Sequence, residues 1–122
     1  MRAEDHRSDK TRPFTGAEYL ESLRDGREVY INGERIADVT AHPAMRNSAR
    51  SLARMYDALH NEKTKERLTS PTDTGSGGYT HKYFRVAKSS AELVAQQGAI
   101  ADWARMSYGW MGRTADYKAA LM

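Results

Sequence analysis

Apolar side chains recur at helical spacing over the last third of the chain. A Ser89–Glu92 capping box precedes them and predicts where the helix begins. Gly109 and Gly112 loosen the backbone further on, so a long amphipathic helix is expected to run into a glycine-bounded break. The apolar positions are Leu93, Ile100, Ala104 and Met111, with Val94, Ala101 and Tyr108 beside them.

The segment after this break presents one arginine and one tyrosine. Thr114 can cap a new helical turn, which would place Arg113 at its start and Tyr117 one turn on. At a spacing of i, i+4 the two side chains can converge on one ligand. From spacing alone, the simpler interpretation is that Arg113 pairs with Asp116 or caps backbone carbonyls, while Tyr117 packs.

The first half of the chain predicts two further helices. Thr15 and Glu18 form a second capping box, opening a short helix to about Arg24 that Gly26 caps. Pro43 introduces the next helix, whose single buried stripe repeats at spacings of four, three, four and three. The stripe consists of Met45, Ala49, Leu52, Tyr56 and Leu59.

One β-hairpin is predicted between these two helices. Asn32-Gly33 separates two short β-rich runs within residues 28–38, and Asn-Gly is a strong hairpin turn. Two strands alone are marginally stable, so the hairpin should lie on another surface. Residues 61–67 are expected to form at most one helical turn, and residues 68–78 a loop without regular structure. Residues 79–85 fit an edge strand or an extended arm.

Three arginines form a ridge on the second predicted helix. Arg46, Arg50 and Arg54 follow one another at i, i+4, a spacing at which like charges destabilise a helix slightly. Asp57 is the nearby acid. The ridge is therefore either a solvated face or a surface that meets an acidic partner.

Composition narrows the class of protein. The 122 residues predict one domain, taken here as residues 13–122 after a charged, disordered tail over residues 1–12. No apolar run approaches the ~18 residues of a membrane span and no signal-peptide core is visible, so a cytoplasmic location is expected. The net charge of +3 comes without a nucleic-acid-binding signature. The chain has no cysteine, and its four histidines lack metal-ligand spacing, so no metal is expected.

Four stretches of the chain, at 15–23, 25–36, 42–51 and 109–118, read TGAEYLESL, DGREVYINGERI, HPAMRNSARS and GWMGRTADYK. In this order they resemble the N-terminal region of the 4-hydroxyphenylacetate 3-monooxygenase family, a region that pyoverdine-chromophore enzymes and 4-hydroxybutyryl-CoA dehydratase share. The resemblance implies a mainly α fold, the helical N-terminal domain of the acyl-CoA-dehydrogenase-like architecture with one β-hairpin. In the family a β-barrel and a C-terminal helical bundle follow, usually in a homotetramer.

The resemblance also implies an activity. Such proteins are oxygenase components that use reduced FAD from a separate reductase to hydroxylate a phenol beside its oxygen. The family's phenol-binding arginine and tyrosine correspond here to Arg113 and Tyr117, while Ala115 replaces the usual proline. A charged donor at this place stabilises the negative charge of a phenolate, which is the better ring nucleophile.

The family extends for several hundred further residues. Its flavin contacts and a third phenol-binding residue, a histidine, lie in that later part, so no cofactor-binding residue is assigned in this chain. We therefore expect a truncated product, one piece of a split gene or a fragment. The alternatives are a fragment similar to 4-hydroxybutyryl-CoA dehydratase, and a non-catalytic remnant that only binds a partner chain.

Overall fold

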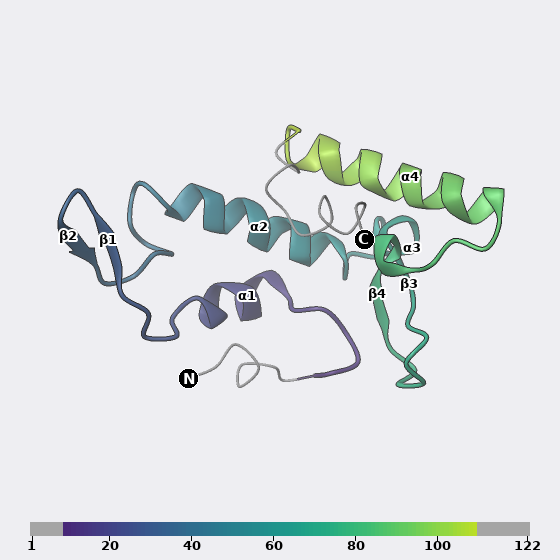
Figure 1. The fold of residues 1–122 in the computed structure, drawn as a ribbon, viewed down its shortest axis with the longest axis horizontal. Coiled ribbons are helices and arrows are strands. Elements are labelled where there is room, and N and C mark those ends of the chain that lie inside the picture. Colours follow the sequence, from purple (N-terminus) through teal and green to yellow (C-terminus); the bar gives the residue numbers. More distant parts are fainter. Residues whose placement is uncertain (1–8, 110–122) are drawn as a thin grey trace.

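The computed structural model describes residues 9–109, which form two α-helical pairs and two short hairpins (Figure 1). Helix α1 spans Gly16–Ser22, and both halves of its predicted capping box form. Thr15 Oγ1 accepts from the Glu18 N–H at 3.2 Å, and the Glu18 carboxylate accepts from the Thr15 N–H at 2.8 Å. The prediction that Gly26 caps this helix is wrong, because the C-cap is Leu23.

Helix α1 packs closely against helix α2, which spans Arg46–Ala58. At the start of α1, the Gly16 N–H donates to Asp57 Oδ1 at 2.7 Å. A Cβ added to Gly16 would lie 2.5 Å from the Ala53 carbonyl oxygen, so only glycine fits this approach. The Tyr19 and Tyr56 rings stack with their centroids 5.0 Å apart. Helix α2 therefore anchors the first turn of α1.

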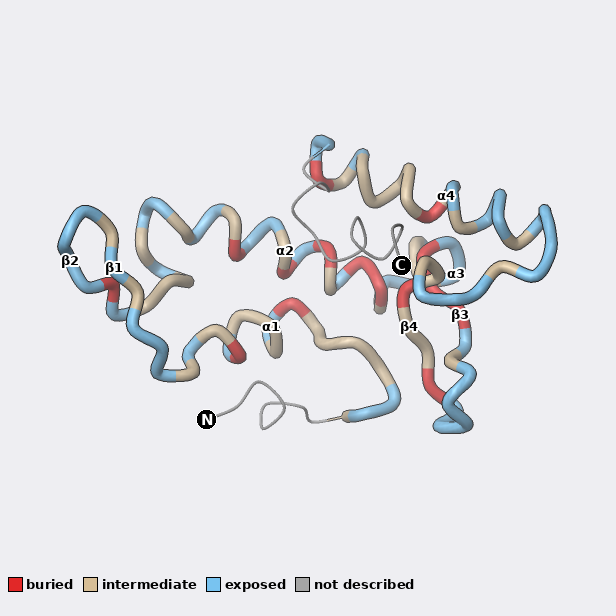
Figure 2. The backbone as a smooth tube through the Cα atoms, in the orientation of Figure 1, coloured by how far each residue is buried: buried red, intermediate tan, exposed pale blue. Residues whose placement is uncertain are grey.

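Helix α2 is buried on more than the predicted stripe. It begins three residues after Pro43, with Met45 as the N-cap. Ala49 and Leu59 are buried as predicted, whereas the other stripe residues are half-buried. The additional burial arises because α2 contacts α1 along one side and the α3–α4 region at its C-terminal end (Figure 2). The buried residues outside the predicted stripe are Ala53, Met55 and Ala58.

The predicted hairpin is confirmed. Strands β1 (Val29–Ile31) and β2 (Glu34–Ile36) pair in antiparallel register, with Ile31 opposite Glu34. Asn32 and Gly33 have φ angles of 50° and 84°, the left-handed conformations that a two-residue turn of this type requires. The hairpin lies at one end of the molecule, beyond the start of α2 (Figure 1). Ile36 is buried, and Tyr30 points to solvent.

A second hairpin corrects the expectation of a structureless loop. Helix α3 (Lys65–Leu68) leads into β3 (Thr69–Pro71), which pairs with β4 (Tyr79–His81), followed by the 3-10 turn η2 (Lys82–Phe84). The run predicted as an edge strand or extended arm therefore starts as a strand. Pro71 is tolerated because it ends its strand, and the glycine-rich run supplies the loop between the strands. The fold is thus mainly helical with two hairpins instead of one.

The segment before α1 lies against the second hairpin. Thr11 O accepts from the Tyr79 N–H at 2.9 Å. A Cβ on Gly78 would lie 1.8 Å from that same oxygen, so the two backbones touch. Arg12 forms a two-point ion pair with Glu18, with both N–O distances 2.8 Å. Thr11 and Arg12 are therefore held by specific contacts, although both precede the predicted domain boundary at residue 13. Residues 1–8 lie outside the described part of the chain.

Helix α4 spans Ser90–Met106, with Ser89 as the N-cap. The Ser89 half of its capping box forms, but the Glu92 carboxylate accepts from the Lys88 N–H at 2.6 Å. The predicted apolar face is wrong at its start, because Leu93 and Val94 are 50% and 66% exposed. Burial instead follows the C-terminal half of α4, the part that lies over α2 and α3 (Figure 2). There Ala99 joins Ala58, Leu59 and Leu68 in the core, and Trp103 and Met106 pack against it.

Within residues 9–109, no helix combines the length and the apolar character needed to cross a lipid bilayer.

Candidate functional site

The predicted site residues Arg113 and Tyr117 lie outside the described residues. The structure does describe the point from which their segment departs. Helix α4 ends at Met106, and Tyr108 and Gly109 take left-handed φ angles of 54° and 78°. The Gly109 N–H donates to the Ala104 carbonyl at 2.9 Å, which closes the helix. The predicted break is confirmed at Gly109, and Gly112 lies beyond the described part.

Arg54 of α2 caps this end of α4. Its guanidinium donates to the Met106 carbonyl oxygen, one of the acceptors that a helix leaves unsatisfied at its C-terminus. One member of the arginine ridge therefore fixes where the segment carrying Arg113 begins. Within residues 9–109, no carboxylate lies within 4.0 Å of Arg46 or Arg50. The capping contact joins residues 52 positions apart, which no local pattern reveals.

His81 is a buried, neutral histidine beneath α4. It is 2% exposed, and its ring lies 3.9 Å from the Trp103 ring in an edge-on arrangement. Burial, with a smaller effect of Lys82, lowers the pKa of His81 to about 3. Its Nδ1 accepts from the Tyr83 N–H at 3.1 Å, so the ring proton is on Nε2. Nε2 has no hydrogen-bond partner among the described residues. His81 therefore packs as a neutral donor and is unsuited to act as a cation.

His60 joins three separate segments. Its Nε2 lies 3.0 Å from the Phe14 carbonyl oxygen and its Nδ1 lies 2.6 Å from the Tyr79 hydroxyl. Because a carbonyl only accepts, Nε2 carries the proton and Nδ1 accepts from Tyr79. Lys65 Nζ lies over the Tyr79 ring, 3.9 Å from its centroid. Sequence reasoning missed both histidine roles, since His60 contacts Phe14 and Tyr79, and His81 contacts Trp103, across long stretches of the chain.

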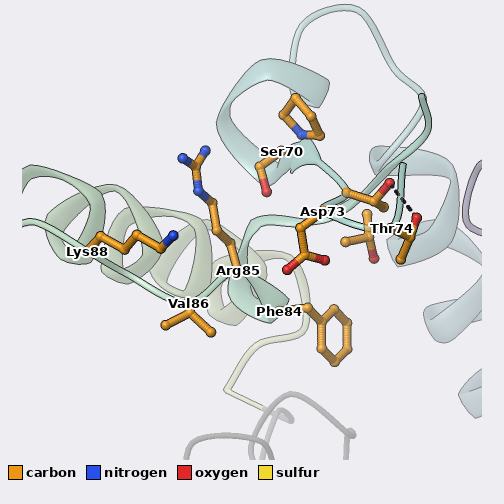
Figure 3. Close-up of a pocket in the computed structure, with 10 residues that line it drawn as sticks. Ser70, Asp73, Thr74, Phe84, Arg85, Val86 and Lys88 are labelled. Atoms are coloured by element: carbon orange, nitrogen blue, oxygen red, sulfur yellow. Dashed lines mark hydrogen bonds between the residues drawn. The ribbon is translucent and has the colours of Figure 1, made fainter. Parts of the chain in front are cut away.

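An open groove of about 620 Å³ lies between the β3–β4 hairpin and residues 84–88, which precede α4 (Figure 3). Ser70 is 5% exposed, faces the groove, and its hydroxyl has no hydrogen-bond partner among the described residues. Arg85 lies in the groove wall but pairs with Glu92 at 2.7 Å. Within residues 9–109, Asp73 and Lys88 have no oppositely charged side chain within 4.0 Å. The groove thus offers one unpaired charge of each sign, whereas the Ser70 hydroxyl is shielded from solvent.

This groove does not fit the phosphates of a flavin dinucleotide. A pyrophosphate needs several free N–H or cationic donors. The groove instead presents the Asp73 carboxylate, which repels a phosphate, and Arg85 is already neutralised by Glu92. No group of three or more His, Asp or Glu within the described residues could hold a metal ion. No cofactor is therefore assigned to this groove.

Comparison with known proteins shows which protein family this chain belongs to. The family described as "4-hydroxyphenylacetate 3-hydroxylase N terminal" matches residues 15–122. The chain belongs to this family, which confirms the resemblance drawn from the four sequence motifs.

Its relatives are considerably longer proteins. The chain is 64% identical over 120 residues to the 4-hydroxyphenylacetate 3-monooxygenase oxygenase component of Pseudomonas aeruginosa, which covers 98% of this chain and 23% of that protein. It is 61% identical over 111 residues to the 4-nitrophenol 2-monooxygenase oxygenase component of a Rhodococcus species, covering 91% of this chain and 21% of the relative. The chain thus spans less than a quarter of the length of these relatives.

A solved structure shows the same fold. The oxygenase component of 4-hydroxyphenylacetate 3-monooxygenase complexed with FAD superposes with a TM-score of 0.76 at 33% identity, over 86% of this chain and 22% of that one. The same values hold for a crystal structure of that component with FAD and 4-hydroxyphenylacetate.

Proposed function

We propose that this chain supplies the substrate-side region of an FADH2-dependent monooxygenase that hydroxylates phenols next to the phenolic oxygen. The observation that carries the proposal is the 64% identity, across 98% of the chain, to a 4-hydroxyphenylacetate 3-monooxygenase oxygenase component. The solved relative that binds FAD and 4-hydroxyphenylacetate shares this fold, which supports a phenol as the substrate class.

In this proposal Arg113 and Tyr117 bind the phenolic oxygen. The guanidinium stabilises the phenolate, whose ring carbons are more nucleophilic, and the tyrosine hydroxyl adds a neutral hydrogen bond. A hydrogen bond to a charged group contributes about 1.5–3 kcal/mol. Arg54 supports this role indirectly, because it caps the end of α4 at Met106, seven residues before Arg113.

The remaining parts of the activity are assigned outside the described residues. FAD activates oxygen when it is bound, and its main contacts are expected in the rest of a longer chain or in a split partner. A separate reductase would supply the reduced flavin. We further propose that residues 13–122 form the N-terminal domain of an acyl-CoA-dehydrogenase-like architecture, in a cytoplasmic homo-oligomer.

The test is reconstitution with the missing regions. This chain is combined with the Pseudomonas aeruginosa relative that lacks its own matching region, and FADH2-dependent catechol formation is measured on a panel of phenols. The matching region of the relative itself is the positive control. Catechol formation with this chain supports the proposal. If the control is active and this chain forms no catechol from any phenol, the chain is a non-catalytic remnant.

Variants of the two site residues test their roles. Arg113→Ala should lower catechol formation by about thirty- to a thousand-fold, equivalent to about 2–4 kcal/mol. Arg113→Lys should recover part of this, since it keeps the charge but loses the planar fork of donors. Tyr117→Phe should cost less than Arg113→Ala. Each variant should release more hydrogen peroxide per FADH2 consumed. Unchanged coupling in Arg113→Ala would make the arginine structural.

A further inference from the structure

The C-terminal end of α4 is held by a side chain from another helix. The Arg54 guanidinium of α2 donates to the Met106 carbonyl oxygen, the last residue of α4, which lies over α2 (Figure 1). Arg54 is itself well anchored, because its neighbours Ala53 and Met55 are buried and α2 packs against α1. The contact therefore ties the peptide that leaves α4 to a fixed part of the fold.

The backbone just beyond this contact takes an unfavourable conformation. Among the described residues, only Asn32 and Tyr108 combine a side chain with a positive φ. Asn32 lies in a hairpin turn that favours it, whereas Tyr108 is 88% exposed and gains nothing from burial of its ring. Such a conformation persists only where the surrounding structure determines it. The hydrogen bond from Arg54 to Met106, two residues earlier, is a contact from outside α4 that can determine it.

A short tether leads from this point to the residues proposed to bind the phenol. Arg113 lies four positions after Gly109 and Tyr117 lies eight positions after it. Four residues span at most about 14 Å, so little chain is available to absorb a change in the direction in which the backbone leaves α4. Precision matters at such a site, since a displacement of ~1 Å can lower a rate by ~100-fold.

We propose that Arg54 is a positioning residue for the hydroxylation: by holding the Met106 carbonyl, it sets the direction in which the segment bearing Arg113 leaves α4. This inference rests on the proposed function. Arg54 acts through Arg113 and contacts neither the substrate nor the flavin. The three arginines of the ridge are therefore not equivalent, since within residues 9–109 no carboxylate lies within 4.0 Å of Arg46 or Arg50 and only Arg54 caps α4.

Amide hydrogen exchange of the 122-residue chain, measured by nuclear magnetic resonance, tests the contact itself. The Ser107 and Gly109 N–H groups donate to carbonyls of α4 and close the helix. Arg54→Ala should accelerate exchange of both amides by about fivefold or more, because the end of α4 opens more often. Arg50→Ala is the matched control, one turn earlier on the same ridge, and should leave both rates within about twofold of the wild type.

A full-length chimaera tests the catalytic consequence. The Pseudomonas aeruginosa relative carries this chain in place of its own matching region, and catechol and hydrogen peroxide are measured per FADH2 consumed with 4-hydroxyphenylacetate. Arg54→Ala should lower the catechol yield by about three- to tenfold, the range of an exposed hydrogen bond, with FADH2 consumption unchanged. Arg54→Lys should recover most of the yield, because an ammonium can still donate to a carbonyl. Arg50→Ala should behave as the wild type.

The double variant separates positioning from folding stability. If Arg54 acts through Arg113, then Arg54→Ala should cause no further loss of catechol in an Arg113→Ala background. Losses that multiply would show that Arg54 serves only the stability of the fold, and would overturn the inference. Unchanged amide exchange in Arg54→Ala, or an equal effect of Arg50→Ala, would overturn it as well.

The outcomes also distinguish this inference from the proposed function. An active wild-type chimaera in which Arg54→Ala keeps the wild-type catechol yield would refute the positioning role alone. A wild-type chimaera that forms no catechol from any phenol would refute the proposed function and this inference together.

Discussion

Two identical substitutions should change the stability of this chain in opposite directions. Gly16→Ala places a methyl group 2.5 Å from the Ala53 carbonyl oxygen and 2.5 Å from Asp57 Oδ2, so α1 must move away from α2. Gly98→Ala adds the same methyl group in the interior of α4, where a Cβ has no heavy atom within 4 Å. The backbone atom at Ala53 cannot rotate aside, whereas the site at Gly98 is open.

The magnitudes follow from these contacts. Overpacking costs about 1–3 kcal/mol, and displacing α1 weakens the Gly16 N–H bond to Asp57, worth about 1.5–3 kcal/mol because its acceptor is charged. The higher helix propensity of alanine compared with glycine offsets at most about 1 kcal/mol of this loss. Gly16→Ala should therefore lower the free energy of unfolding by about 2–4 kcal/mol. Gly98→Ala should raise it by about 0.5–1 kcal/mol, through the smaller entropy of its unfolded chain.

Urea unfolding at 25 °C, followed by far-ultraviolet circular dichroism, measures both changes. The dependence of the free energy on urea concentration should stay the same, so the midpoint alone should move. A Gly16→Ala chain as stable as the wild type would show that α1 does not pack on α2 through this glycine. A destabilised Gly98→Ala chain would show that the surface of α4 at that position is covered.

Three further predictions concern the pH dependence of stability, flavin binding and the turn of the β1–β2 hairpin. Lowering the pH from 6.5 to 4 should reduce the free energy of unfolding by about 3 kcal/mol through His81. The pKa of His81 is about 3 in the folded chain and 6.5 in the unfolded chain, so the unfolded chain binds the proton first. His81→Asn should flatten the dependence of the unfolding free energy on pH, and an unchanged dependence would contradict the burial of a neutral His81. Titration of the chain with micromolar FAD should show no saturable change in tryptophan fluorescence, and saturable binding would place a flavin site within this chain. Gly33→Ala should cost about 1–2 kcal/mol of stability, measured by urea unfolding, because its φ of 84° is strained for other residues; wild-type stability would mean that the turn rearranges freely.

Elements that depend on adjacent residues could be predicted from the sequence. The Thr15–Glu18 capping box, the Ser89 N-cap and the Asn32-Gly33 turn all form as expected, because each is determined within four residues. The second hairpin was missed since its strands are three residues each and carry mostly polar side chains. The buried face of α4 was misjudged because helical periodicity cannot show which half of a helix another element covers.

The candidate site divides in the same way. Arg113 and Tyr117 were assigned through a motif shared with a family, and they stay predictions because they lie outside the described residues. The sequence indicates only that Arg54 belongs to a charged ridge, yet its side chain caps α4 at Met106, which lies 52 positions further along the chain. His60 likewise bonds to a carbonyl 46 positions distant. Contacts at such separations depend on the assembled fold, which residue spacing does not encode.

The touching backbones of Thr11 and Gly78 determine how far this chain can be shortened. The family match begins at residue 15, and a clone cut at that boundary would appear sensible. Such a clone would lack the Thr11 carbonyl that accepts from the Tyr79 N–H, together with the Arg12 side chain that forms an ion pair with Glu18. The cut edge of β4 would then be open to solvent or to another molecule. Expression clones for crystallography or screening should therefore retain residues from 9 onward, even though these lie upstream of the family boundary.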